Sequence, residues 1–130
     1  GASTSKFTDD MVLYSKLRPY LNKVVIPDEQ GYATTELVGL LPDPKTINKV
    51  FLAHLLRSDE FVHYAVSLSG GARMPRTPMK EFRKFECITP PINLQIDFEN
   101  LVGKIEGLKN QLYDLISYLD SSIKTIILKK

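Results

Sequence analysis

Basic side chains are concentrated in one short stretch of this sequence, between positions 73 and 84. It holds five basic residues and a single acid, a net charge of +4 within twelve positions: Arg73, Arg76, Lys80, Arg83, Lys84 and Glu81. Side chains of this type and density can bind the phosphate groups of a nucleic acid. A cluster of this size is equally typical of a solvated surface loop. The net charge of the whole chain is only +2, so overall charge gives weak support to nucleic-acid binding.

The sequence holds no catalytic, metal-binding or cofactor-binding motif. His54 and His63 are nine positions apart in helical sequence, a poor arrangement for a metal site. There is no glycine-rich phosphate loop and no dinucleotide-binding fingerprint. Cys87 has no neighbouring histidine and lies in an apolar context, which argues against a nucleophile. We therefore expect no catalytic residue, no metal and no cofactor.

The composition is that of an ordinary globular protein, with 43% apolar and 25% charged residues. No apolar run approaches the roughly 18 residues that a membrane-spanning helix needs. The single cysteine excludes an internal disulfide, which suits a reducing cytoplasm. Cys87 lies between Phe85 and Ile88 and is predicted to be a buried strand residue. Residues 1–5 are expected to be a flexible lead or a remnant of cloning.

Short strands are predicted in the first third of the chain, with one more after the helices, each bounded by turn or proline signals. They cover residues 11–18, 23–26, 32–38 (continuing to 40–41) and 85–88. The first three are too few to form a stable sheet of any size by themselves.

The centre of the chain is predicted to be helical. Either Thr46 or Asn48 can cap a first helix, and Ser58 can cap a second one. Gly70 and Gly71 end the second helix, because glycine readily adopts the conformation that follows a helix. These signals predict two consecutive helices followed by a glycine-rich turn.

The final segment, from Asn93 to Lys130, carries a heptad repeat behind a Thr-Pro-Pro sequence at 89–91. Apolar residues occupy eight of its nine a and d positions: Phe98, Leu101, Ile105, Leu108, Leu112, Leu115, Leu119 and Ile126. We call these eight residues the seam. Seven-residue spacing places them on one stripe of a helix, which further apolar e positions widen. A helix of about 35 residues is roughly 50 Å long, so part of it is expected to pack on something else.

Gly103 and Gly107 lie in the same segment but away from the seam, at f and c positions. Each costs roughly 1 kcal/mol relative to alanine inside a helix. They are either tolerated variation on an exposed face or a place where a second helix packs closely.

The order of elements sets the fold class. Thr77 resembles an N-cap with Pro78 at the first helical position, so a short helical turn is expected before the strand at 85–88. Strands, helices, one strand and a long helix predict an α+β fold. It consists of a small mixed body of short strands and helices, followed by a long C-terminal coiled-coil helix.

Several segments, in their order and spacing, resemble the specificity (S) subunits of type I restriction–modification systems. They are residues 12–23, residues 34–36, and the run from Phe51 through Gly70–Gly71 to the Thr-Pro-Pro sequence and Gln95, followed directly by the heptad helix. The resemblance covers nearly the whole chain. Recognition domains of that family are longer. The chain is thus similar to the C-terminal portion of one recognition domain, residues 1–91, followed by the spacer helix and assembly arm, residues 92–130.

The resemblance implies a non-catalytic, cytoplasmic component that recognises double-stranded DNA. In that family an S subunit carries two recognition units, each reading half of a split sequence, and its two long helices pack antiparallel as a spacer. The helices also bind the methyltransferase (modification) subunits, and a separate restriction subunit translocates and cleaves DNA. The implied partners are these subunits, the DNA, and a second recognition unit or a second copy of this chain bound through the C-terminal helix.

Two arginines are the candidates for reading bases under this interpretation. Arg73 and Arg76 follow the glycine-rich turn, and arginine can bind guanine through two hydrogen bonds. Ser69 and the amides of Gly70 and Gly71 can bind phosphate. The arginines would supply sequence preference and the others affinity.

Three further residues are candidates for contacts to the phosphates of the DNA backbone. Lys80 begins a short helix and would act as a point charge on the phosphates. Lys16 and Arg18 alternate on one predicted strand face and either add phosphate contacts or are simply exposed. Glu36 is expected to hold a loop or pair with a basic group.

A competing interpretation is a protein-interaction module without DNA binding. The coiled-coil helix would then be the whole function, and the basic loop would only increase solubility. An RNA or single-strand binder fits less well, because tyrosine and phenylalanine do not cluster with the basic residues as stacking platforms would.

Overall fold

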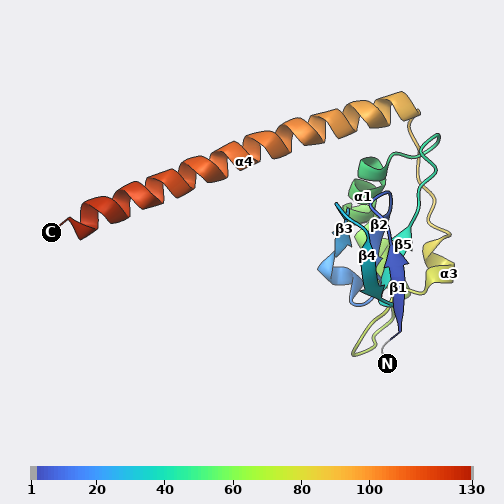
Figure 1. Cartoon of the computed structure of the whole chain (residues 1–130). Helices are drawn as coiled ribbons and strands as arrows, with labels where there is room; N and C mark the ends of the chain where they lie inside the picture. The colour runs from blue at the N-terminus through green and yellow to red at the C-terminus, as the bar shows by residue number, and fades with distance from the viewer. Residues whose placement is uncertain (1–2, 130) are drawn as a thin grey trace. The chain divides into compact units, whose positions relative to one another are not determined.

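The computed structural model describes residues 3–129, which form two compact units. The first unit ends at Gln95 and the second begins at Ile96. The fold is α+β, a small body of short strands and helices followed by one long helix (Figure 1). The elements are β1 (Thr4–Phe7), β2 (Val12–Ser15), the 3-10 turn η1 (Pro19–Leu21), β3 (Val24–Val25), β4 (Gly31–Thr34), β5 (Leu37–Leu40), α1 (Lys49–Arg57), α2 (Asp59–Leu68), α3 (Met79–Phe82) and α4 (Ile92–Leu128).

The strands form two small antiparallel sheets. β1 pairs with β4, and β2 lies between β3 and β5 in a three-stranded sheet. All four residues of β2 are buried, because it is the central strand and α1 packs against it and β3 (Figure 1). α2 packs against α1 and η1. Within the body, α1 therefore covers the three-stranded sheet, and α2 lies against α1 and η1.

The core of the body is aromatic. Phe61 on α2 is only 1% exposed and meets the rings of Tyr14, Phe82 and Phe85 edge-on, with centroids 5.8, 5.2 and 5.0 Å away. Edge-to-face contacts of this kind add to the stability gained by burying the rings. One side chain from α2 therefore joins the central strand to α3 and the segment after it.

The two central helices begin where their caps predict. The Asn48 side chain accepts hydrogen bonds from the amides of Val50 and Phe51 at 2.8 and 3.1 Å, so Asn48, and not Thr46, caps α1. Ser58 caps α2 by accepting from the amide of Phe61 at 3.3 Å. Both caps satisfy amides that a helix leaves unpaired at its start.

The N-terminal prediction was wrong. Thr4–Phe7, expected in part to be a flexible lead, forms β1, and Phe7 lies opposite Gly31 of β4. A side chain at Gly31 would meet the Phe7 ring at 2.8 Å, so glycine lets the ring cover that strand. Pairing with a strand far along the chain overrides the weak local signal of small polar residues. Gly1 and Ala2 lie outside the described residues.

The strand predicted at 32–38 is two strands. The chain turns at Thr35–Glu36, so that β4 pairs with β1 while β5 pairs with β2. A continuous run of strand-forming residues does not reveal this turn. The turn is needed only because the residues before and after it pair in two different sheets. The strand predicted at 23–26 is shorter, Val24–Val25.

The segment after α3 also differs from the prediction. Residues 85–88 form no strand, and Cys87 is exposed instead of buried. Phe85 is drawn into the aromatic core, while Ile88 is 91% exposed. Pro78, not Thr77, precedes the first residue of α3, and the Thr77 hydroxyl is used elsewhere. Because the Phe85 ring packs into the core, residues 85–88 do not lie beside a strand with which they could pair.

Gln95 fastens the first turn of α4 to the body. Its side chain is 1% exposed, accepts a hydrogen bond from the Asn48 amide at 2.7 Å, and donates to the carbonyl oxygens of Thr46 and Pro90 at 3.1 and 2.7 Å. These bonds join the first turn of α4, and the residue just before it, to the segment at 46–48. The start of the long helix is therefore built into the body by one buried polar side chain.

Candidate nucleic-acid interface

The chain from Lys16 to Arg18 lies antiparallel to residues 75–77. The Arg18 amide donates to the Pro75 carbonyl and the Thr77 amide donates to the Lys16 carbonyl, each at 2.7 Å, with Leu17 opposite Arg76. The strand predicted over 11–18 therefore ends at Ser15, and Arg18 takes a left-handed conformation with φ of 53°. This pairing brings three of the predicted DNA-binding residues together: Lys16, Arg18 and Arg76.

The buried end of this pairing is held by Tyr14. Its phenolic oxygen lies 3.1 Å from the Thr77 hydroxyl, and both residues are buried, at 3% and 2% exposure. Burial raises the pKa of Tyr14, and the hydrogen bond with Thr77 opposes that rise in part. The phenol therefore stays protonated at neutral pH, and the hydrogen bond ties the basic segment to the central strand.

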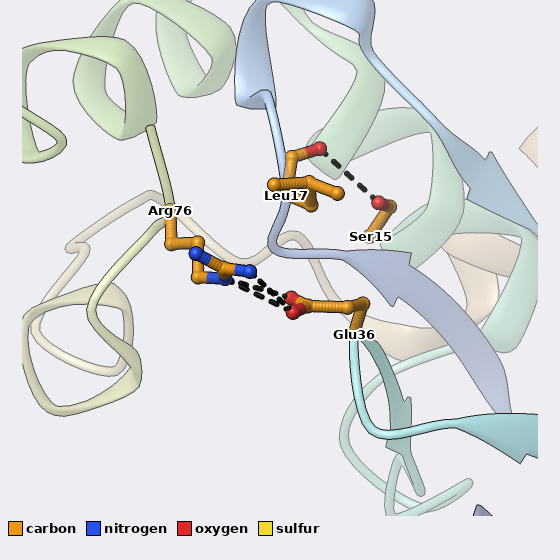
Figure 2. A network of polar contacts seen from close by, with 4 residues as sticks. All are labelled: Ser15, Leu17, Glu36 and Arg76. Carbon is orange, nitrogen blue, oxygen red and sulfur yellow. Dashed lines mark hydrogen bonds and ion pairs between the residues drawn. The ribbon is translucent and has the colours of Figure 1, made fainter. Parts of the chain in front are cut away.

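Glu36 forms a double contact with Arg76. The Arg76 Nε donates to both carboxylate oxygens at 3.0 and 3.2 Å, and Nη2 lies 2.9 Å from Oε1. Figure 2 shows the carboxylate facing one edge of the guanidinium, and it also shows the Ser15 hydroxyl, which donates to the Leu17 carbonyl at 3.3 Å. Glu36 thus fills the pairing role expected of it, and its partner is one of the predicted base-reading residues.

The charges around Glu36 all favour its ionised form. The hydrogen bond from Arg76 holds the pKa of the Glu36 carboxyl below its usual 4.5, and the charges of Arg76 and Lys16 act in the same direction. Because this pKa is lowered on folding, the contribution of the pair is present above the usual value and is lost as the pH falls through the lowered one. At neutral pH Glu36 is therefore ionised and paired with Arg76.

The glycine-rich turn carries the other predicted residues of this region. Ser69 ends α2, and its hydroxyl donates to the Ala65 and Val66 carbonyls. Gly70 follows with φ of 60°, a conformation that other residues rarely adopt, and Gly71 and Arg73 are exposed. Arg73 has no hydrogen-bonding partner within the described part of the chain, so its guanidinium is available to a ligand.

Lys80 is exposed on α3 and forms no ion pair with any residue from 3 to 129. Further along, Lys84 pairs with Glu81 at 3.1 Å. The basic stretch seen in the sequence is thus divided in the structure. Arg76 joins the paired segment of residues 16–18, Arg73 lies on the exposed turn, and Lys80 lies on a separate short helix.

Sequence reasoning missed two features of this region. It did not predict that residues 16–18 pair with residues 75–77, because no local pattern links segments so far apart. It also did not predict Gln95 as a buried hydrogen-bonding residue, although its place four positions after two prolines marked the start of the helix. For Glu36, the sequence predicted a basic partner but did not identify it as Arg76.

The seam residues of α4 are largely exposed. Seven of the eight are between 53% and 72% exposed: Leu101, Ile105, Leu108, Leu112, Leu115, Leu119 and Ile126. A continuous apolar stripe of this kind is uncommon on the surface of a monomeric protein. A side chain at Gly103 or Gly107 would meet nothing within 4 Å, so neither glycine is required by a contact in this structure.

No helix in the described residues is long and apolar enough to cross a membrane. Those residues also contain no group of three or more metal-binding side chains.

No protein-family model matches the chain. It is similar to the Type I restriction enzyme EcoDI specificity subunit of Escherichia coli, with 23% identity over 135 aligned residues. The alignment covers 99% of this chain and 30% of the relative, so the chain spans less than a third of that protein's length. Both the α+β body and the long helix fall inside the aligned region. The chain is therefore distantly similar to a type I specificity subunit over its whole length.

Proposed function

We propose that this chain recognises double-stranded DNA as part of the specificity component of a type I restriction–modification complex. The observation that carries the proposal is the alignment with the EcoDI specificity subunit, which extends over 99% of the chain. The placement of the basic residues supports it, because the chain at Lys16 and Arg18 pairs with the chain at Arg76, which follows the exposed turn that carries Arg73. The chain contributes recognition and no catalytic residue.

Contacts to DNA divide between two kinds of residue. Lys80, Lys16 and Arg18 bind phosphates and set the position of the body on the duplex. The amides of Gly70 and Gly71 add hydrogen bonds to the DNA backbone, whereas the Ser69 hydroxyl, predicted to do the same, already donates to the Ala65 and Val66 carbonyls. Arg73 and Arg76 reach base edges and supply the sequence preference.

The long helix has a separate role in this proposal. Its seam pairs with the corresponding helix of a second recognition unit, or of a second copy of this chain, and so sets the distance between two half-sites. Another face, which includes Gly103 and Gly107, docks the methyltransferase subunits, and the restriction subunit joins through the assembled complex. The exposed seam supports this role, because a stripe of this length needs a partner to leave water.

The exposed seam also favours a second candidate, a coiled-coil interaction module that does not bind DNA. The two candidates differ in one property. A DNA-binding chain has a strongly salt-dependent affinity for duplex DNA, whereas an interaction module does not bind duplex DNA even at low salt.

The test is a salt titration of the whole chain against a duplex of random sequence, followed by fluorescence anisotropy. We expect log K to fall steeply with log salt concentration. Lys80→Ala should weaken binding to all sequences alike and reduce the slope by about 1. Arg73→Ala should instead cost about 1–3 kcal/mol on a preferred sequence and relax the choice at one base position.

Lys45→Ala is the matched control, because Lys45 is also exposed in the first unit. Its segment lies at the end of the body opposite residues 69–75 (Figure 1). We expect it to leave the slope unchanged. No binding at low salt, or an equal effect of the Lys45 and Lys80 substitutions, would rule out the DNA interface described above.

A further inference from the structure

We infer that Glu36 is a positioning residue, which fixes the Arg76 guanidinium so that its outer edge binds a guanine. This inference rests on the proposed function and adds the base type, the donor atoms and a second residue that determines specificity. Its basis is the geometry of the hydrogen bonds between Glu36 and Arg76.

Glu36 occupies one edge of the guanidinium and leaves the other edge available. The contacts to the carboxylate use Nε and Nη2 at 2.9 to 3.2 Å. A guanidinium has five N–H donors in a fixed planar fork. The side-on contact therefore leaves the outer edge, formed by Nη1 and the second hydrogen of Nη2. Nη1 has no hydrogen-bonding partner among residues 3–129, and the Arg76 side chain is 51% exposed.

The backbone of Arg76 is held on both sides. The Pro75 carbonyl accepts from the Arg18 amide, and the Thr77 amide donates to the Lys16 carbonyl. Thr77 is buried against Tyr14. Side chain and backbone are thus both fixed before any ligand arrives, which lowers the entropy lost on binding. Arg73 has no such support, since it lies on the exposed turn.

The outer edge matches a guanine better than a phosphate. In the major groove, guanine presents O6 and N7 as two adjacent acceptors, which the end of an arginine fork binds together. A phosphate could also accept two bonds, but it carries a full negative charge, and the nearby Glu36 carboxylate would repel it. The Glu36–Arg76 pair is close to neutral as a unit. It therefore contributes discrimination between bases and little counterion release.

This assignment predicts opposite effects on two measured quantities. Glu36→Gln removes the repulsion and frees the guanidinium, so affinity for random duplex and the steepness of its salt dependence should both rise. The same substitution should lower the preference for guanine at one position about tenfold or more, because the fork is no longer oriented. Arg76→Lys keeps the charge without the fork and should lose the same preference.

The experiment uses the whole chain and a duplex pool with randomised positions. The sequence selected by the unmodified chain is compared with its guanine→adenine variants, for the chain and each substitution. Glu81→Gln is the matched control, because Glu81 is in a similar exposed ion pair, with Lys84, and loses the same charge. We expect it to leave base preference unchanged. Removal of an exposed pair has a small effect on stability, which thermal unfolding of each variant verifies.

The outcomes separate this inference from the proposed function. If the unmodified chain selects no sequence, the proposed function fails, and the inference fails with it. If the chain selects a sequence and Glu36→Gln keeps the same guanine preference, only the inference is overturned. A guanine preference that is retained in Arg76→Lys would show that Arg76 acts as a charge and not as a hydrogen-bonding fork, which also overturns it. A selective loss of guanine preference in both variants, with higher affinity of Glu36→Gln for random DNA, supports it.

Discussion

Replacing Gln95 with alanine will lower the free energy of unfolding of the first unit by about 2–4 kcal/mol. The side chain is 1% exposed and makes three hydrogen bonds to backbone groups of Thr46, Asn48 and Pro90. Its loss leaves the Asn48 amide and the carbonyl oxygens of Thr46 and Pro90, which are partly buried, without their hydrogen-bonding partner. The chain has no tryptophan, so unfolding in urea is best followed by near-ultraviolet circular dichroism of the core tyrosines.

Two further variants make the Gln95 experiment specific. Gln111→Ala removes the same side chain from an exposed position of the same helix and should change stability by less than about 0.5 kcal/mol. Gln95→Glu keeps the shape and the acceptor but, when ionised, cannot donate to the two carbonyl oxygens. It should be destabilised nearly as much as Gln95→Ala. Equal stability of Gln95→Ala and Gln111→Ala would show that the hydrogen bonds of the buried Gln95 amide do not stabilise the first unit.

Placing charge in the middle of the seam will abolish self-association of the chain. Leu108 and Leu112 lie at successive d and a positions and are 65% and 56% exposed. In a paired helix both would be buried, and lysine at these positions would carry its charge into that interface. Lysine is a good helix former, so Leu108→Lys with Leu112→Lys should leave α4 itself intact. Light scattering after size exclusion should show a dimer for the unmodified chain and a monomer for this variant.

The matched control places two lysines on the opposite side of the same helix. Asn110 and Ser117 are both exposed and occupy f positions, away from the seam. Asn110→Lys with Ser117→Lys adds the same charge and should leave the dimer unchanged. A chain that is monomeric without substitution at all concentrations, or a dimer that survives the Leu108 and Leu112 changes, would contradict pairing through the seam.

The helices were predictable from the sequence because their signals are local. Asn48 and Ser58 act on amides two or three residues away, and Gly70 acts directly after Ser69, the last capping residue of α2. The heptad repeat likewise needs no distant partner to indicate a helix, and α4 runs from Ile92 to Leu128. In each case the residues that carry the signal also carry the physical effect.

The strands were predicted less well because their partners are distant in sequence. Thr4–Phe7 becomes a strand only because Gly31–Thr34 lies beside it. Residues 85–88 have suitable strand-forming side chains but no partner, since Phe85 is taken into the aromatic core. Alternation of side chains identifies a segment that could pair, and tertiary contacts decide whether it does.

The candidate site shows the same division between local and distant information. The basic residues themselves were visible in the sequence, including Arg73, Arg76 and Lys80. Which of them has a partner was not visible, because Glu36 and Arg76 are brought together by the pairing of residues 16–18 with residues 75–77. The distinction between a supported arginine and an exposed one is a property of the fold.

We expect this chain to discriminate among DNA sequences, and selection from a randomised duplex pool is the decisive experiment. The whole chain is incubated with the pool at moderate salt, and the bound duplexes are recovered, amplified and sequenced over several rounds. We expect enrichment of one short motif that contains guanine, which is lost in the double substitution Arg73→Ala with Arg76→Ala. A bound fraction that remains random in sequence through all rounds would contradict it.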